Sequence, residues 1–127
     1  MKDTIRTIIE KAEEFLSDGK YLLEDEREEA SANRAYYAAF TATRALLHSL
    51  EIEVKSHKGV QVKFSQHFIK AGIFEPKYNQ IITTLFDVKQ RVDYDYYSVL
   101  ELEQAQLLME YAEDFVLKVR KYLESTL

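Results

Sequence analysis

The stretch SANRAYYAAFTATRALLHSL, at positions 31–50, decides the fold of this chain. It is rich in alanine and leucine and contains neither glycine nor proline, a composition that favours an α-helix from about residue 30 to residue 50. At about 100° per residue, one polar stripe occupies a sector about 80° wide, and the wider remaining arc is apolar. A helix with such an arc must be nearly surrounded by the rest of the protein. The stripe consists of Arg34, Tyr37, Thr41, Arg44 and His48.

Apolar residues recur at helical spacing on both sides of this stretch. Gly72 suits the end of a short helix, and Pro76 suits the first turn of the next one. The segment from Ser98 to Glu101 has the form of a capping box, which predicts that the last helix starts there. The remaining helices are expected at residues 3–23, 58–71 and 76–93, and from residue 98 to the C-terminus.

Two features concern the first helix and its connection to the second. Gly19 falls on the apolar stripe of the first helix, where glycine costs about 1 kcal/mol relative to alanine. Its presence indicates either a helix that crosses closely at this position or a bend. The run from Glu24 to Glu29 contains no apolar residue and predicts a solvated loop.

The overall composition favours an all-α fold with one domain. The chain has 127 residues, of which 46% are hydrophobic and 31% are charged, a balance that can bury a core. Three glycines and one proline are too few for the turns of a β-sandwich or barrel. Since the expected connections are short, we predict an antiparallel four-helix up-and-down bundle with an additional short helix, formed by residues 1–127 as a single domain.

Several classes of protein and site are excluded by what the sequence lacks. No cysteine is present, which excludes disulfides, thiolate metal sites and cysteine nucleophiles. Neither a signal peptide nor a membrane-spanning run is found, and we expect a cytoplasmic protein without membrane contact. The three histidines lie nine and ten residues apart and no phosphate-binding glycine loop occurs, so we expect neither a metal ion nor a cofactor.

The charge distribution points to one region that suits anions. The net charge is −5, which repels nucleic acid from most of the surface. Residues 54–74 are the exception, because they hold four lysines and two histidines and no acidic residue. Within them His57, beside Lys55 and Lys58 at a helix start, indicates either a simple helix cap or a site where backbone N–H groups hold an anion.

Two arginines occupy positions that suggest a binding cleft. Arg34 lies inside the alanine-rich helix, and Arg91 lies near a helix end, just before the segment DYDYY at residues 93–97. A guanidinium offers forked donors that suit phosphate or carboxylate. One interpretation pairs both arginines with carboxylates of the bundle, such as Asp93 or Asp95. In the other, both arginines face one hollow that holds an anion, with Tyr37 and Asp95 in its lining.

Three motifs, in this order, resemble the small prokaryotic HEPN-domain proteins. The first is SANRAYYAAF at residues 31–40, the second is KSHKGV at residues 55–60, and the third is Arg91 followed by Asp95 and Tyr96. The likeness is greatest to an uncharacterised subgroup with an R-A-Y-Y-A helix and a late R-x3-D-Y motif, and it covers nearly the whole chain. It implies a bundle of four to five antiparallel helices that forms a symmetric dimer.

The resemblance also implies a partner and a chemistry. Such proteins are often encoded beside a minimal nucleotidyltransferase, as toxin–antitoxin or related pairs. Many members are metal-independent ribonucleases with an R-x4–6-H motif assembled across the dimer, in which arginine steadies the phosphate and histidine assists attack by the RNA 2′-hydroxyl. Here Tyr96 stands where the shortest form of that motif, counted from Arg91, has its histidine, and a phenol is a poor base at neutral pH.

Three functions are compatible with these residues. The favoured one is a module that binds a nucleotide or nucleic acid without strong ribonuclease activity, as the partner of a minimal nucleotidyltransferase. The second is a metal-independent endoribonuclease in which Arg91 acts with a substitute base, either Tyr96 or a histidine from another helix. The third is a structural adaptor with tyrosine acceptor sites, since related pairs attach a nucleotide to a tyrosine near this motif. The residues expected to bind the ligand are Arg34, Tyr37, His57, Arg91, Asp95 and Tyr96.

Overall fold

Helix α2 (Glu28–Ser49) lies at the centre of the molecule, as its sequence predicts. The computed structural model describes residues 1–127 and contains five α-helices, a π-helical turn and no strand. α2 packs against every other α-helix and buries twelve of its own residues. The expected all-α helical bundle is therefore confirmed. The other elements are α1 (Asp3–Glu24), α3 (His57–Phe64), the π-helical turn η1 (Ser65–Ile69), α4 (Pro76–Tyr94) and α5 (Leu102–Thr126).

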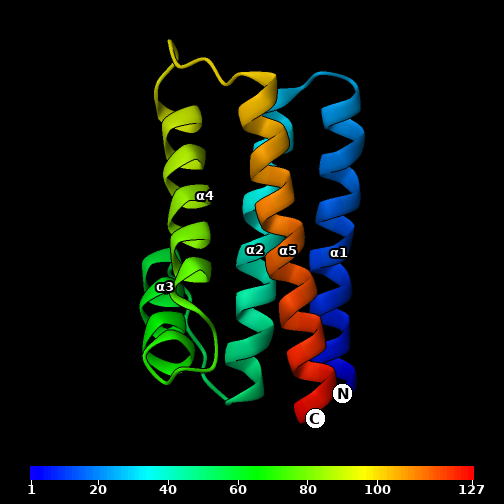
Figure 1. The fold of residues 1–127 in the computed structure, drawn as a ribbon, viewed down its shortest axis with the longest axis vertical. Helices are drawn as coiled ribbons and strands as arrows, with labels where there is room; N and C mark the ends of the chain where they lie inside the picture. Colours follow the sequence, from blue (N-terminus) through cyan, green and yellow to red (C-terminus); the bar gives the residue numbers. More distant parts are fainter.

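The four long helices run alternately up and down (Figure 1). α1 and α4 rise in this view while α2 and α5 descend, so both termini lie at the same end of the bundle, and the short α3 lies toward that end as well. α4 packs against α2, α3 and α5 but not against α1. None of the helices combines the length and the apolar composition that a membrane crossing requires.

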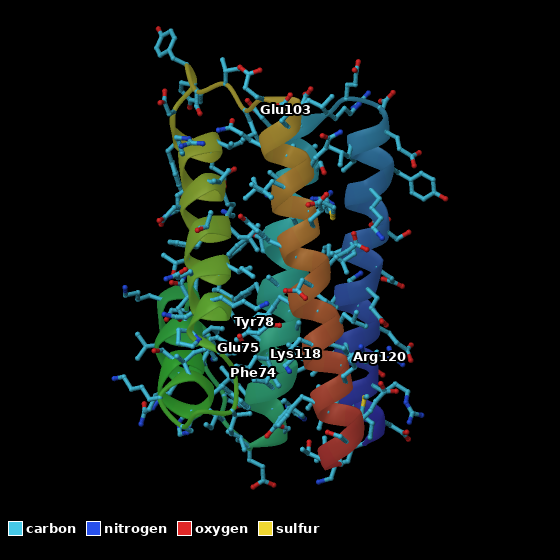
Figure 2. All side chains as sticks on the ribbon, viewed as in Figure 1. Phe74, Glu75, Tyr78, Glu103, Lys118 and Arg120 are labelled. Carbon is cyan, nitrogen blue, oxygen red and sulfur yellow. The ribbon has the colours of Figure 1, made fainter.

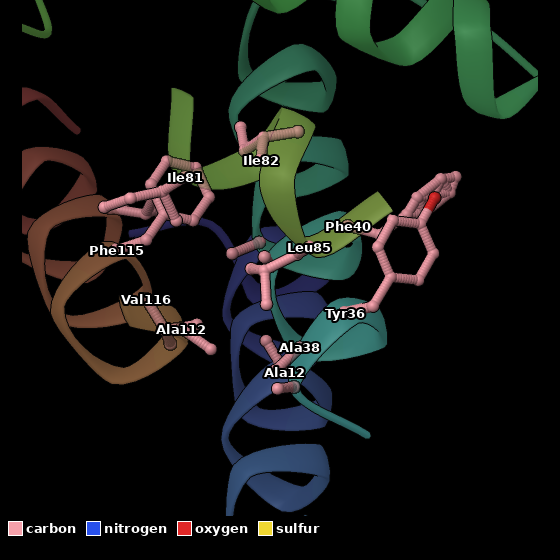
Figure 3. Close-up of a cluster of buried hydrophobic side chains, with 14 of the residues drawn as sticks. Ala12, Tyr36, Ala38, Phe40, Ile81, Ile82, Leu85, Ala112, Phe115 and Val116 are labelled. Carbon is pink, nitrogen blue, oxygen red and sulfur yellow. The ribbon is translucent and has the colours of Figure 1, made fainter. Parts of the chain in front are cut away.

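The core is formed by small residues of α2 and larger residues of its neighbours (Figure 3). Six alanines of α2 are buried, and such small side chains allow neighbouring helices to approach closely. Leu85 of α4 and both Phe115 and Val116 of α5 are almost completely buried in the same cluster. The apolar arc predicted for residues 30–50 is thus the surface of α2 on which the other helices pack.

Aromatic side chains fill the end of the core beside α3. The ring centroids of Phe64 and Phe68 lie 5.9 Å apart, and each lies 5.8 Å from the centroid of Phe74. Phe74 and Tyr78 stand where the chain enters α4 (Figure 2), and the ring of Phe74 lies 6.2 Å from that of Phe115 in α5. These contacts anchor α3 and the start of α4 to the bundle.

Gly19 marks a close crossing of α1 with α2 and α5. A methyl group added at this position would lie 2.3 Å from Met109 Cε of α5 and 3.1 Å from Arg34 Cβ of α2. The Gly19 carbonyl accepts a hydrogen bond of 2.9 Å from the buried hydroxyl of Ser31. The close crossing, rather than a bend, therefore explains this glycine.

The third helical segment differs in its backbone from the predicted one. One helix was expected over residues 58–71, whereas α3 gives way after Phe64 to the wider turn η1. There the Lys70 N–H bonds to the Ser65 carbonyl, five residues earlier rather than four.

The end of this segment lies where the sequence predicts it. Gly72 adopts φ +77°, a left-handed conformation that glycine accepts readily. The Gly72 N–H bonds to the Ile69 carbonyl and the Ile73 N–H bonds to the Phe68 carbonyl, which together form a Schellman motif.

The capping box predicted from Ser98 is wrong by three residues. α5 begins at Leu102 with Glu101 as its N-cap, and Glu101 forms the box with Gln104. The Glu101 N–H donates to the Gln104 side-chain oxygen at 3.1 Å. Ser98 is instead part of the turn that leaves α4, where its N–H donates to the Asp95 carbonyl at 3.0 Å. The pair Glu101 and Gln104, three residues further along the chain than predicted, therefore caps the start of α5.

The connection between α1 and α2 is shorter than the acidic run predicts. Only residues 25–27 lie outside the two helices, because the glutamates at either end of the run are helical. Glu26 adopts φ +56°, in the left-handed region where a side chain is strained. Its N–H bonds to the Leu23 carbonyl, and the Arg27 N–H bonds to the Leu22 carbonyl, an arrangement in which glycine is usual.

We expect Glu26→Gly to raise the free energy of unfolding by roughly 0.5–1 kcal/mol, because removal of the side chain relieves more strain than the added chain freedom costs. Glu24→Gly is the matched control: it lies inside α1 and should lower the free energy of unfolding by a similar amount. Urea denaturation followed by circular dichroism measures both. An equal loss of stability in the two variants would contradict the strain assigned to Glu26.

Candidate functional site

Tyr36 and His57 form the centre of a polar site on α2. Tyr36 is only 2% exposed, and His57 is the first residue of α3. The Ser56 hydroxyl caps α3 by accepting a hydrogen bond of 2.9 Å from the Gly59 N–H, which fixes where the helix begins. The Tyr36 hydroxyl is hydrogen-bonded to His57 Nδ1. A residue of α2 thus holds the imidazole at the start of α3 in place.

Aromatic rings shield the imidazole on its faces. The ring of Phe40 stacks on His57 with centroids 4.4 Å apart, and the ring of Phe86 from α4 lies 6.2 Å away. Tyr37 meets His57 edge to face at 6.2 Å. The imidazole is therefore packed among apolar surfaces while it stays within reach of solvent.

Lys89 of α4 completes the site. Its Nζ lies 6.0 Å from the ring centroid of Tyr36 and 5.8 Å from that of Tyr37, within the range of cation–π interaction. Nζ also donates a hydrogen bond of 2.6 Å to Asp93 Oδ2, one turn further along α4. The side chain of Lys89 is only 14% exposed. We call Tyr36, Tyr37, His57 and Lys89 the α2–α4 cluster.

The surroundings shift the pKa values of the cluster. Burial lowers the pKa of His57, and the charges of Lys89 and Arg44 lower it further. The hydrogen bond to Asp93 raises the pKa of Lys89, and burial raises the pKa of Tyr36. At neutral pH the cluster therefore combines a protonated amine with an uncharged imidazole and an uncharged phenol, groups that can bind an anion and exchange a proton with it.

A groove of about 640 Å³ lies beside the cluster, between α1 and the C-terminal half of α2. Arg44 belongs to both places: it lines the groove, and its guanidinium lies 6.0 Å from the ring of Phe40, which stacks on His57. Arg44 forms no ion pair. The groove is lined by Thr7, Ile8, Glu10, Lys11, Glu14, Thr41, Arg44, Leu47, His48, Ile52, Glu53, Val54 and Lys55.

The structure brings two of the predicted binding residues together. Tyr37 and His57 both lie in the α2–α4 cluster. Arg34 lies nearly one turn before Tyr37 on α2, where its Cβ faces Gly19 of α1, and its guanidinium donates a hydrogen bond of 2.7 Å to Asn33 Oδ1. Arg34 is partly buried and does not line the groove.

The other predicted residues lie at the end of α4 and in the loop that follows. Arg91 is exposed, and neither it nor Arg34 pairs with a carboxylate, so the interpretation of both as ion pairs of the bundle is wrong. Because Arg91 follows Lys89 by two residues, about 200° around the helix, it lies on a different face of α4 from the cluster. Asp95 accepts a hydrogen bond within its own loop, and Tyr96 is 93% exposed. A hollow shared by both arginines stays a prediction.

Two members of the cluster were not predicted as site residues. Tyr36 was assigned to the apolar arc of its helix, and its burial confirms that assignment, although its hydroxyl reaches His57. Lys89 did carry a signal, because it follows Leu85 by four residues on the inward face of α4. A lysine on such a face must either reach solvent or have partners within the protein. The partners of Lys89 are two tyrosine rings and Asp93.

We expect Lys89→Gln to raise the pKa of His57 toward its ordinary value of 6.5, because the substitution removes a nearby positive charge. Titration of the histidine ring protons by NMR measures this pKa, and His48 and His67 provide internal references. Lys118→Gln, on the outer side of α5 (Figure 2), is the control that should leave the pKa of His57 unchanged. Identical titration curves in both variants would show that Lys89 does not act on the imidazole.

Comparison with known proteins identifies the family of this chain. The sequence model of the HEPN domain matches residues 5–122. A Methanocaldococcus jannaschii protein named "Putative toxin" is 35% identical over 127 residues, which are 100% of this chain and 94% of the relative. A second protein of that organism with the same designation is 32% identical over 124 residues, 98% of this chain and 84% of the relative. A Thermotoga maritima protein named "UPF0332 protein" is 31% identical over 114 residues, 90% of this chain and 86% of the relative.

The family assignment rests on nearly the whole chain. The matched residues extend from the first turn of α1 to the last turns of α5, and they include the α2–α4 cluster and the groove. The relatives are likewise aligned over most of their own length. The resemblance inferred from the sequence motifs is confirmed, and the chain belongs to the HEPN domain family.

Proposed function

We propose that this protein binds RNA or a nucleotide and acts as one component of a toxin–antitoxin-like pair, with a minimal nucleotidyltransferase as its partner. The observation that carries the proposal is the α2–α4 cluster, in which Lys89 lies against two tyrosine rings beside His57. Since the net charge of −5 repels anions from most of the surface, an anion is best held where cations gather. The designation shared by the two M. jannaschii relatives supports a toxin-like role.

The cluster has the groups that a nucleotide phosphate needs. The ammonium of Lys89 has three donors, of which Asp93 takes one, and the guanidinium of Arg44 has no carboxylate partner. A phosphate can therefore be held by Lys89 and Arg44 together. The ring of Tyr37 lies between Lys89 and Phe15 but is only partly buried, so its exposed part can contact a base.

A homodimer is part of this proposal. Arg91 is exposed on a different face of α4 from the cluster, a position from which it can contact a phosphate bound to a second copy. The adjoining loop exposes Tyr94, Tyr96 and Tyr97 at 77%, 93% and 94%, and exposed aromatic groups of this kind suit contact with another protein. The alternative role as a structural adaptor, with one of these tyrosines as a nucleotide acceptor, rests on the same exposure.

We expect the protein to bind a short single-stranded RNA, and Lys89→Gln to weaken this binding about tenfold, because one charge-assisted hydrogen bond to phosphate contributes about 1.5 kcal/mol. Fluorescence anisotropy with a labelled oligonucleotide measures the dissociation constant. The affinity should also fall as salt is raised, because contacts to phosphate release counterions.

Lys118→Gln is the control for this experiment, because it removes the same charge from the exposed surface of α5. It should bind RNA as the unchanged protein does. The proposal is rejected if neither RNA nor nucleotide binds at low salt, or if the two variants bind equally.

A second candidate function is a metal-independent endoribonuclease, and His57 favours it. The pKa of this imidazole is lowered, which keeps it uncharged at neutral pH and able to take a proton from a 2′-hydroxyl. If Nδ1–H donates to the Tyr36 oxygen, Nε2 has the lone pair that this step requires. His57 would then replace Tyr96 as the base, and Lys89 would steady the phosphate.

This second function predicts cleavage of RNA in the presence of a chelator and its loss in His57→Gln. His67→Gln, a histidine of η1 outside the cluster, should cleave as well as the unchanged protein. Gel analysis of an end-labelled RNA after incubation with each variant provides the measurement. If RNA stays intact with the unchanged protein, the ribonuclease function is rejected. This result does not affect the binding function, which the anisotropy measurement tests separately.

A further inference from the structure

The groove between α1 and α2 has the size of a ligand site but no role in the function proposed so far. Its volume of about 640 Å³ lies within the range of sites that hold small molecules, commonly about 300–1,000 Å³. Its floor includes the apolar side chains of Ile8, Leu47 and Ile52. A ligand that fits it should therefore have at least one apolar surface.

One wall of the groove is cationic. Arg44 and His48 lie one turn apart on α2, and Lys55 approaches from the connection to α3. Neither Arg44 nor Lys55 is neutralised by an ion pair. This wall suits a phosphate, for which guanidinium and ammonium groups are the usual protein donors.

The opposite wall offers hydrogen-bond acceptors. Glu10 and Glu14 of α1 line it, and Lys11 is bound to Glu14 with an Nζ–Oε2 distance of 3.2 Å. The carboxylate of Glu10 forms no ion pair. Glu53, in the same connection as Lys55, adds a third carboxylate to the lining of the groove. Carboxylates accept hydrogen bonds from amino and hydroxyl groups and repel a second phosphate.

Arg44 connects this groove to the α2–α4 cluster. It lines the groove, and its charge also acts on the imidazole of His57. Along α2 the two sites follow one another on the polar stripe, with Tyr37 at the cluster and Thr41, Arg44 and His48 at the groove. One extended ligand can therefore occupy both sites with a phosphate at Arg44.

We propose that the groove binds one nucleoside unit of the RNA whose phosphate lies at the cluster, so that the ligand extends over at least two nucleotides. This inference rests on the proposed function. The base lies on the apolar surface of Ile8 and Ile52, and its amino groups or the ribose hydroxyls donate to Glu10. The linking phosphate lies at Arg44.

The charge pattern favours a nucleoside over other ligands for this groove. A ligand made only of phosphates would place negative charge beside Glu10 and Glu53. A purely apolar ligand would desolvate the charged walls without replacing their hydrogen bonds. A nucleotide unit supplies an apolar face, neutral donors and a phosphate, which match the apolar side chains, the carboxylates and the cationic side chains that line the groove.

The test compares adenosine monophosphate with a 5′-phosphorylated adenosine dinucleotide by isothermal titration calorimetry at low salt. We expect the dinucleotide to bind about tenfold more tightly, because a second set of contacts is made in the groove. Thr7→Trp narrows the groove and should lower the affinity of the dinucleotide to that of adenosine monophosphate, which still has the phosphate site at the cluster. Thr4→Trp is the matched control, because Thr4 is equally exposed on α1 and does not line the groove.

Lys55→Glu is a second variant that changes the charge of the groove and not its shape. It should also remove the dinucleotide advantage, whereas Lys70→Glu, outside the groove, should preserve it. The inference is overturned if the unchanged protein binds both ligands equally, or if the advantage persists in both Thr7→Trp and Lys55→Glu. If adenosine monophosphate still binds in either case, only this inference is rejected, and the phosphate site of the proposed function is retained. If neither ligand binds, the proposed function and this inference fail together.

Discussion

The enclosure of α2 by the other helices is the constraint on which the rest of the structure depends. Six buried alanines allow its neighbours to approach closely. Where α1 crosses α2 and α5, Gly19 leaves room for the side chains of Arg34 and Met109. The buried hydroxyl of Ser31 satisfies its hydrogen-bonding capacity at the Gly19 carbonyl. Since the other faces of α2 are occupied by the core, its polar chemistry is confined to one stripe.

The candidate site is a direct consequence of that confinement. Tyr36 lies at the border between the apolar arc and the stripe, so its ring belongs to the core while its hydroxyl bonds to His57. Lys89 reaches the same border from α4 and is stabilised there by two aromatic faces and Asp93. The same packing that stabilises the bundle therefore orients the groups of the candidate site.

The sequence patterns predict the helices better than their ends. Helix interiors follow from the spacing of apolar residues, which changes little when one boundary moves. Boundaries depend on single hydrogen bonds, and two nearby residues can compete for the same role, as Ser98 and Glu101 do at the start of α5. The π-helical turn after Phe64 likewise depends on one backbone bond, from Lys70 to Ser65, that no side-chain pattern indicates.

The sequence by itself determined that the chain is helical, that residues 30–50 form its centre, and that one polar stripe there faces outward, because these properties follow from periodicity along a single helix. It also predicted Tyr37 and His57 as binding residues, and the structure places these two side by side. Only the tertiary structure decided that Lys89 joins them and that Arg91 does not, because the rotation of α4 against α2 is set by contacts between residues far apart in the chain. The groove beside Arg44 was likewise decided by the tertiary structure alone, since its walls come from α1, α2 and the connection to α3.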